Sequence, residues 1–141
     1  MKNCTGDEDF TWLQDYAIFD SGQLTEYEHL VGLKGLEVAI NDCVEEARFR
    51  VDTIGAAAEV GDGETIAREA RVLKSMCETC GFPRLAELTR VVENVAKVRS
   101  AANIRPLIEE LFRNLELSLA MLEAFADNFG AKLKHGSPRK R

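Results

Sequence analysis

Apolar residues recur along most of the chain at intervals of three and four, the spacing that aligns them on one side of an α-helix. Between positions 33 and 58 this stripe includes Leu36, Ile40, Cys43 and Ala47, and similar stripes follow in three later segments. No segment of comparable length shows the period of two that marks a half-buried strand. The pattern therefore predicts an all-α protein.

Glycine and proline mark the ends of the predicted helices. Gly81 and Gly130 come directly after two of the apolar stripes, and Pro83 and Pro106 fall in the first turns of the helices that follow. Short connections force successive helices to run in opposite directions, so we expect an antiparallel four-helix bundle with a short extra N-terminal helix. The predicted helices cover about residues 23–31, 33–60, 64–80, 83–98 and 104–129.

The two ends of the chain differ from this bundle. Residues 1–16 are predicted to form an N-terminal arm whose aromatic side chains lie against the helices, and residues 17–130 form the bundle itself. Residues 131–141 have no apolar face and are basic, which predicts a disordered tail.

The charge distribution narrows the classes of function. The net charge is −6 at pH 7, and all 24 acidic residues precede Gly130, whereas five of the 18 basic residues follow it. Because phosphate contacts need a basic face, we do not expect so acidic a bundle to bind nucleic acid. For the basic tail, contact with nucleic acid or anionic lipid stays open beside a merely solubilising role.

The sequence also indicates where the protein resides. No apolar run approaches the roughly 20 residues that span a bilayer, and the first residues are polar and acidic. The four cysteines, Cys4, Cys43, Cys77 and Cys80, lack the dense spacing of a secreted disulfide scaffold. We therefore expect no membrane partner, and a cytoplasmic protein with reduced thiols.

The helix over about 64–80 carries the most informative exposed face. Its apolar stripe centres on Leu73, so the opposite side projects outward at about 100° per residue. Arg71 and Lys74 are surface neighbours there and form, with Arg68, a small basic island on an acidic body. From spacing alone, an ordinary solvated helix face explains this pattern. The outward residues are Glu64, Arg68, Arg71, Ser75 and Glu78, flanked by Lys74.

The segment ARVLKSMCETCGFPRLAEL at 70–88 resembles the signature of histidine-containing phosphotransfer (HPt) domains, which reads roughly Ala-His-x-Leu-Lys-Gly, a few small or apolar residues, Gly, a helix start and Leu-x-x-Leu. FDSGQL at 19–24 is similar to the family's opening, and AAAEVGDGE at 56–64 to its interhelical turn. The resemblance covers about residues 17–128 and implies the helical bundle of that family.

Two positions depart from the family pattern. Arg71 stands where the family has its phosphoryl-accepting histidine, and a guanidinium, which stays protonated and offers only donors, cannot take that role. Ser75 replaces the glycine that leaves room beside the histidine. Lys74 matches the family's lysine, which helps to hold the phosphoryl oxygens.

The resemblance implies docking without phosphotransfer. HPt domains dock this face onto the receiver domain of a response regulator, so we expect a receiver domain or a histidine kinase as partner, a monomer, no enzymatic activity, and no metal or cofactor. Two alternatives stay open: a genuine phosphotransfer protein altered at position 71, and a structural helical adaptor. The expected partner-binding residues are Arg68, Arg71, Lys74, Ser75 and Glu78.

The remaining chemical candidates have simpler explanations. His29 precedes a segment that echoes the motif but lies in the wrong helix, and His135 lies in the tail without a packed environment. Cys77 and Cys80 have the spacing of a redox or metal pair, but both sulfurs point toward the predicted core and no second pair completes a zinc site. Core packing is the preferred interpretation, with redox sensing as its alternative. Carboxylates that cluster on helix surfaces, such as Glu45 with its neighbours, are read as solvated.

Overall fold

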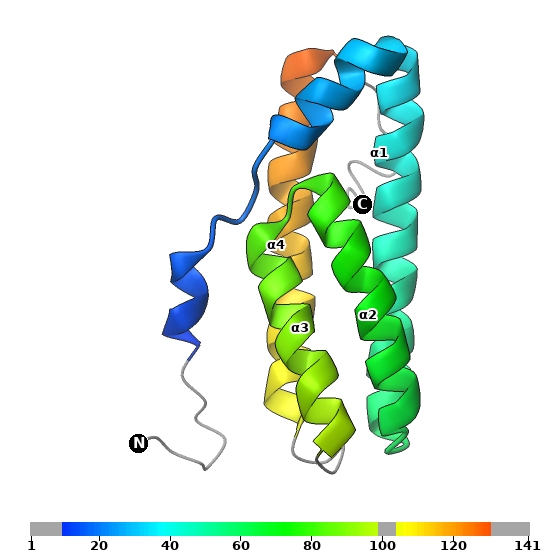
Figure 1. The fold of residues 1–141 in the computed structure, drawn as a ribbon, viewed down its shortest axis with the longest axis vertical. Helices are drawn as coiled ribbons and strands as arrows, with labels where there is room; N and C mark the ends of the chain where they lie inside the picture. The colour runs from blue at the N-terminus through cyan, green and yellow to red at the C-terminus, as the bar shows by residue number, and fades with distance from the viewer. Residues whose placement is uncertain (1–9, 99–103, 131–141) are drawn as a thin grey trace, which may run out of the picture.

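The computed structural model describes residues 10–98 and 104–130, and in this part of the chain every regular element is a helix. Four helices run alternately up and down and form the antiparallel bundle that the sequence predicts (Figure 1). Each packs against the next, and the last closes the ring on the first. The elements are the 3₁₀ helix η1 (Thr11–Asp15), α1 (Gly22–Glu59), α2 (Gly63–Cys80), α3 (Pro83–Val98) and α4 (Arg105–Phe129).

The first long helix contains the two helices that the sequence predicts on either side of Gly32. They follow each other as α1, and Gly32, with φ 81° and ψ 175°, is non-helical and forms a sharp bend between them. Only glycine adopts this backbone conformation readily. Residues 22–31 therefore turn away from the bundle axis and cross its upper end (Figure 1).

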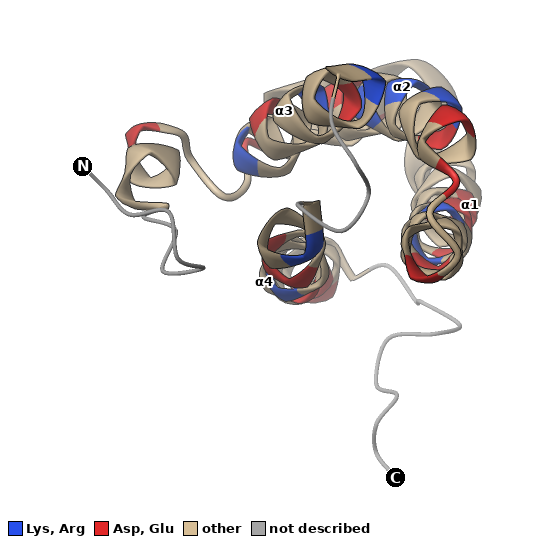
Figure 2. Ribbon diagram, turned by 90° about the horizontal axis from the view of Figure 1, so that it is seen from below, with Lys and Arg blue, Asp and Glu red and all other residues tan. Residues whose placement is uncertain are grey.

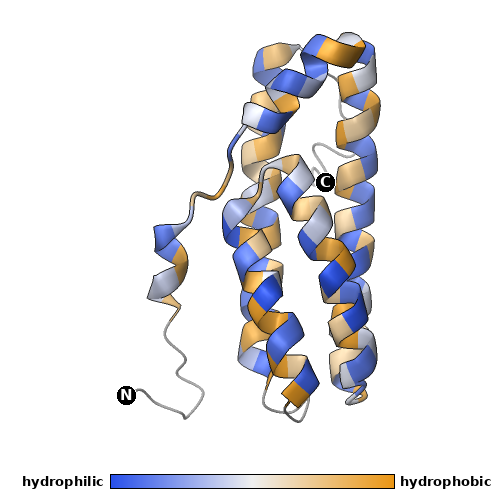
Figure 3. Cartoon of the chain, viewed as in Figure 1, coloured by the Kyte–Doolittle hydropathy of each residue, from blue (hydrophilic) through white to orange (hydrophobic). Residues whose placement is uncertain are grey.

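The core is formed by the apolar stripes of all four helices, and apolar and polar positions alternate around each of them (Figure 3). In α2 the predicted stripe is buried throughout. In α1 most of the predicted stripe is buried too, but Val44 is buried in place of Cys43, and Ala57 in place of Ala58. A period of 3.6 residues makes an apolar stripe drift around a long helix. Cys43 is therefore half-buried at the edge of the core, facing α2.

The segment before α1 is held against the junction of α2 and α3. The amide of Asp20 donates to the carbonyl of Gly81 at 2.8 Å, and the amide of Arg84 donates to the carbonyl of Ala17 at 2.9 Å. Gly81 has φ 85°, and a Cβ there would lie 2.0 Å from the carbonyl oxygen of Asp20. Phe19 adds a ring contact with Phe82 at 6.1 Å. The sequence Gly81–Phe82 therefore ends α2 and also anchors the N-terminal segment.

The predicted arm and tail fall mainly outside the described residues. Residues 1–9 and 131–141 are not described, so the expected disorder of the tail and the division into three regions stay predictions. Within the described part, η1 packs beside α3 and buries Leu13. No described helix is both long and apolar enough to cross a membrane.

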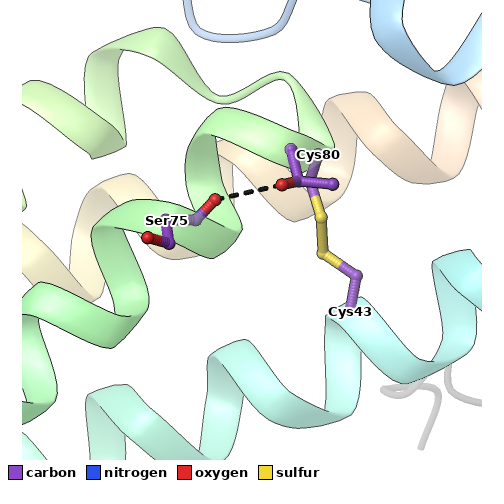
Figure 4. Close-up of a disulfide and its surroundings, with 4 residues drawn as sticks. Cys43, Ser75 and Cys80 are labelled. Atoms are coloured by element: carbon purple, nitrogen blue, oxygen red, sulfur yellow. Dashed lines mark hydrogen bonds between the residues drawn. A yellow bond between two sulfur atoms is a disulfide. The ribbon is translucent and has the colours of Figure 1, made fainter.

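The expectation of reduced thiols is wrong for two of the cysteines. Cys43 of α1 and Cys80 at the end of α2 form a disulfide across the two antiparallel helices (Figure 4). The preferred interpretation of Cys77 and Cys80, core packing, is confirmed for Cys77, which is a buried free thiol, whereas Cys80 is buried but bonded to Cys43. Cys4 lies outside the described residues.

Candidate functional site

The outward side of α2 carries the candidate docking face. The structure places all five residues expected to project outward on the exposed surface, with Lys74 half-buried beside them. Asp62 fixes the start of this helix, because its carboxylate accepts from the amide and the hydroxyl of Thr65 at 3.1 and 2.7 Å. We call the exposed set the α2 ridge: Glu64, Arg68, Arg71, Ser75 and Glu78.

Arg71 stands near the centre of the α2 ridge and is paired with α3. Its Nε and Nη2 both lie 3.0 Å from Oε2 of Glu93. The arginine side chain is 68% exposed, whereas that of Glu93 is only 12% exposed. Nζ of Lys97 reaches the same carboxylate oxygen at 3.2 Å. The guanidinium is therefore solvent-facing and held by a carboxylate at the edge of the core.

The ionisation of Glu93 follows from these neighbours. Partial burial raises the pKa of its carboxyl, but hydrogen bonds from Lys97 and Arg71 outweigh that effect and the pKa falls below its ordinary value. Glu93 is therefore an anion at neutral pH, and it compensates one of the two cations that it contacts.

The predicted basic island is less basic than its sequence indicates. Lys74 donates to Glu78 one turn later at 2.9 Å, and Arg68 donates to Thr65 at 3.4 Å. Together with the Arg71–Glu93 pair, these contacts leave a surface with interspersed charges of both signs over α2 and α3 (Figure 2). Such exposed pairs are weak and exchange partners readily.

Two hollows flank the α2 ridge. On the side of α1, a groove of about 490 Å³ is mostly apolar and reaches the Cys43–Cys80 disulfide. On the side of α3, a hollow of about 520 Å³ is bordered by three cations, Arg68, Arg71 and Lys97, and by the acidic Glu64. The ridge thus has an apolar flank and a charged flank. The groove on the α1 side is lined by Gln23, Leu24, Tyr27, Ala39, Asp42, Cys43, Glu46, Ser75, Met76, Thr79 and Cys80.

Reasoning from the sequence missed Glu93 and Lys97, although a signal for them exists. The α2–α3 hairpin turns about Phe82, so residues at equal distances from Phe82 face each other, and Arg71 is as far before Phe82 as Glu93 is after it. Glu93 and Lys97 also have the i, i+4 spacing of a helical ion pair. The groove had no comparable signal, because it depends on the bend at Gly32 and on the spacing of α1 and α2.

The other chemical candidates are not brought together. His29 is exposed on the N-terminal part of α1, and His135 lies outside the described residues. Burial raises the pKa of the Cys77 thiol, so no reactive thiolate forms there. Among the described residues, no group of three or more His, Cys, Asp or Glu side chains is placed to hold a metal ion.

The α2 ridge offers hydrogen-bond donors but no phosphoryl acceptor at its centre. A guanidinium has five N–H donors and no lone pair for phosphorus, so the chemistry open to Arg71 is charge-assisted hydrogen bonding to carboxylate or phosphoryl oxygens. The hydroxyl of Ser75 and the amine of Lys74 lie one turn away on the same helix.

Comparisons with known proteins agree with this architecture. The family model described as "Hpt domain" matches residues 38–127, which include the whole α2 ridge. The chain is also similar to a crystal structure of histidine-containing phosphotransfer protein B (HptB) from Pseudomonas aeruginosa PAO1, with a TM-score of 0.70 and 18% sequence identity. That similarity covers 79% of this chain and 96% of the other, and it supports the fold. A search among curated proteins finds no match.

The family match extends over more than half of the chain and spans most of α1, all of α2 and α3, and nearly all of α4. Hpt domains are carriers rather than catalysts, and they act with response regulators and kinases in phosphorelays. The helical bundle, the ridge on α2 and the family match lead to one conclusion: the chain belongs to the Hpt domain family, the phosphotransfer modules of two-component signalling.

Proposed function

We propose that this protein is a pseudo-phosphotransfer module that docks its α2 ridge onto the receiver domain of a response regulator and carries no phosphoryl group itself. It would occupy the receiver and keep it from its proper phosphotransfer partner. It would do so as a monomer in the cytoplasm, without enzymatic activity. A histidine kinase is the other partner that the family admits.

The observation that carries this proposal is the identity and setting of Arg71. It occupies the motif position of the phosphoacceptor histidine, it is 68% exposed, and its guanidinium is held by Glu93. A histidine accepts phosphorus through a ring nitrogen that keeps its lone pair near neutral pH, whereas arginine stays protonated. The surrounding ridge keeps the exposure that docking requires, but the reactive atom is missing.

The chemistry of the partner matches the two flanks of the ridge. The phosphorylation site of a receiver domain is a cluster of acidic residues, to which Arg71 and Lys74 can donate charge-assisted hydrogen bonds. To do so, Arg71 exchanges Glu93 for the partner's carboxylates, an exchange that its exposure allows. The apolar groove on the α1 side then supplies surface that is buried on docking, while the charges supply orientation and a faster association rate.

A binding titration tests docking. Each receiver domain encoded by the source organism is titrated with the wild-type chain, with Arg71→Glu plus Lys74→Glu, and with the control Arg105→Glu plus Arg113→Glu. The control makes the same change in net charge on α4, which lies across the bundle from α2. We expect the ridge reversal to weaken binding by at least about tenfold, because charges of the wrong sign then face the acidic pocket. The control should bind as the wild type does.

The same titration distinguishes the docking proposal from the alternative of a structural helical adaptor. A structural adaptor whose motif-like face is incidental would bind its partner equally well with and without the ridge reversal. If no receiver binds the wild-type chain, titration with the histidine kinases of the same organism decides whether the kinase is the partner. Failure of both would overturn the proposal.

The second candidate function is a phosphotransfer protein altered at one position, and Lys74 favours it. This lysine matches the family's phosphoryl-holding residue and remains one turn from position 71. Phosphoryl transfer from a labelled receiver to Arg71→His, but not to the wild-type chain, would show that the surrounding machinery is intact. It would indicate that histidine is the natural residue at this position.

A further inference from the structure

The Cys43–Cys80 disulfide lies in the wall of the groove that flanks the α2 ridge. Cys43 comes from the middle of α1 and Cys80 from the last turn of α2, and both line the groove together with Ser75 of the ridge (Figure 4). No other covalent link joins two helices among the described residues. Breaking or forming this bond therefore affects both α1 and α2, which are the two long walls of the groove.

We propose that the Cys43–Cys80 disulfide is a redox-controlled tie between α1 and α2 that sets the order of the apolar groove, and with it the affinity of the α2 ridge for its partner. The effect on affinity rests on the docking function proposed above. The effect on the groove does not depend on it.

The two cysteines line the groove, from which a small reductant can approach the bond. Cys80 is only 6% exposed, whereas Cys43 is half-buried and forms part of the groove wall. A thiolate of a dithiol reductant that enters the groove attacks Sγ of Cys43. The Sγ–Sγ bond breaks, and the electron pair leaves on Sγ of Cys80, which then takes a proton. The second thiol of the reductant attacks the mixed disulfide, frees Cys43 as a thiol, and closes the oxidised reductant.

The neighbouring thiol does not compete in this exchange. Cys77 lies one turn before Cys80, but it is buried, and burial raises its pKa so that no thiolate forms at neutral pH. The pairing therefore stays between Cys43 and Cys80. Reoxidation by a disulfide such as oxidised glutathione restores the same bond.

The shape of the rest of the groove also depends on how α1 is placed relative to α2. Its third wall is the bent N-terminal part of α1, including Leu24 and Tyr27, which reaches the groove only because the chain bends at Gly32. With the disulfide closed, α1 and α2 are fixed relative to each other and a partner meets a preorganised surface. With the disulfide open, part of that ordering has to occur on binding, which lowers affinity.

Hydrogen exchange tests the groove directly. The wild-type chain is compared oxidised and reduced with dithiothreitol, beside Cys43→Ala plus Cys80→Ala and the control Cys77→Ala. We expect reduction, or the double substitution, to speed exchange by at least about tenfold in residues 22–46 and 75–80, with much smaller changes in α4. Cys77→Ala should keep the response to reductant. The proposal fails if oxidised protein yields no Cys43–Cys80 linked peptide on digestion, or if exchange rises equally throughout the bundle.

Receiver titration then links the groove to function. We expect the oxidised wild type to bind about three- to tenfold more tightly than the reduced protein, with the double alanine variant insensitive to reductant. Local opening of the groove without receiver binding in either state would retain the tie and reject the proposed docking function. Binding that is equal in both states, with an unchanged groove, would reject the tie and retain docking.

Discussion

The two sides of the α2 ridge are built in different ways. On the α3 side, two straight helices meet in a symmetric hairpin, and the surface is defined by exposed ion pairs such as Arg71–Glu93. On the α1 side, the helix is bent at Gly32 and tied by a disulfide, and the surface is an apolar groove. The first side can change charge partners at little cost, whereas the second depends on backbone geometry and a covalent bond. We infer that the α3 side gives orientation and the α1 side gives affinity.

The largest expected effect comes from the junction where the two sides meet. Gly81→Ala places a methyl group 2.0 Å from the carbonyl oxygen of Asp20 and forces a left-handed backbone on alanine. Because the neighbour is backbone rather than a flexible side chain, we expect a loss of about 2–5 kcal/mol in the free energy of unfolding. Urea unfolding followed by circular dichroism measures it. A loss below about 1 kcal/mol would show that Asp20 is not held there.

Reduction of the disulfide should have the second largest effect on stability. The bond closes a loop with a sequence separation of 37. Such a crosslink restricts the unfolded chain, so reduction should lower the free energy of unfolding by about 2–4 kcal/mol. Urea titrations with and without dithiothreitol measure this difference, and Cys43→Ala plus Cys80→Ala should abolish it. Equal stability of the two wild-type forms would contradict the crosslink.

Straightening the bend on the α1 side should cost less. Gly32→Ala leaves the new methyl group in open space, so the penalty comes from the backbone conformation alone. We expect a loss of about 1–3 kcal/mol, or a straightened α1 with a disrupted groove. Chemical-shift changes confined to residues 22–46 would support this account. Gly61→Ala, also at positive φ in open space but far from the groove, serves as the control and should leave those shifts unchanged.

On the α3 side, releasing Arg71 should change stability little and binding more. Glu93→Gln removes the carboxylate that holds the guanidinium, and because Arg71 is 68% exposed the pair contributes no more than about 1 kcal/mol to stability. Since the wild type must break this pair to dock, we expect receiver affinity to rise about two- to fivefold. The matched control is Glu110→Gln on α4, whose partner Arg113 is 64% exposed. Unchanged affinity in Glu93→Gln would show that Arg71 is already free to bind.

The smallest expected effect is the pH dependence of the same pair. The folded-state pKa of Glu93 is lowered from its ordinary value of 4.5, so its contribution to stability is present above pH 4.5 and disappears as the pH falls through the lower folded-state pKa. The stability difference between wild type and Glu93→Gln should therefore shrink in that acidic range. A difference that does not change with pH would mean that Glu93 is not stabilised as an anion.

The sequence was sufficient for features that depend on local pattern. The period of the apolar residues and the positions of Gly81 and Pro83 predicted α2, α3 and the antiparallel bundle, and the helix period placed Arg71 on the exposed side. The pattern also placed a helix boundary at Gly32, between the segments over about 23–31 and 33–60, but not the direction in which the first of them turns.

The pattern of residue types along the chain does not predict features that depend on contacts between helices. The disulfide joins Cys43 to Cys80 across two helices, and no local spacing relates these two cysteines. Glu93 could be found only from the register of the hairpin, which follows from counting in both directions from Phe82. Tertiary register, rather than residue type, decides which side chains complete the site.

The most direct test of docking without phosphotransfer is a single incubation of a phosphorylated receiver domain with the wild-type chain, analysed at once for complex formation and for the location of the label. The account predicts a complex in which the phosphoryl group stays on the receiver, because the guanidinium of Arg71 has no lone pair with which to accept it. Label on the wild-type chain, recovered as phosphohistidine at His29 or His135, would contradict it.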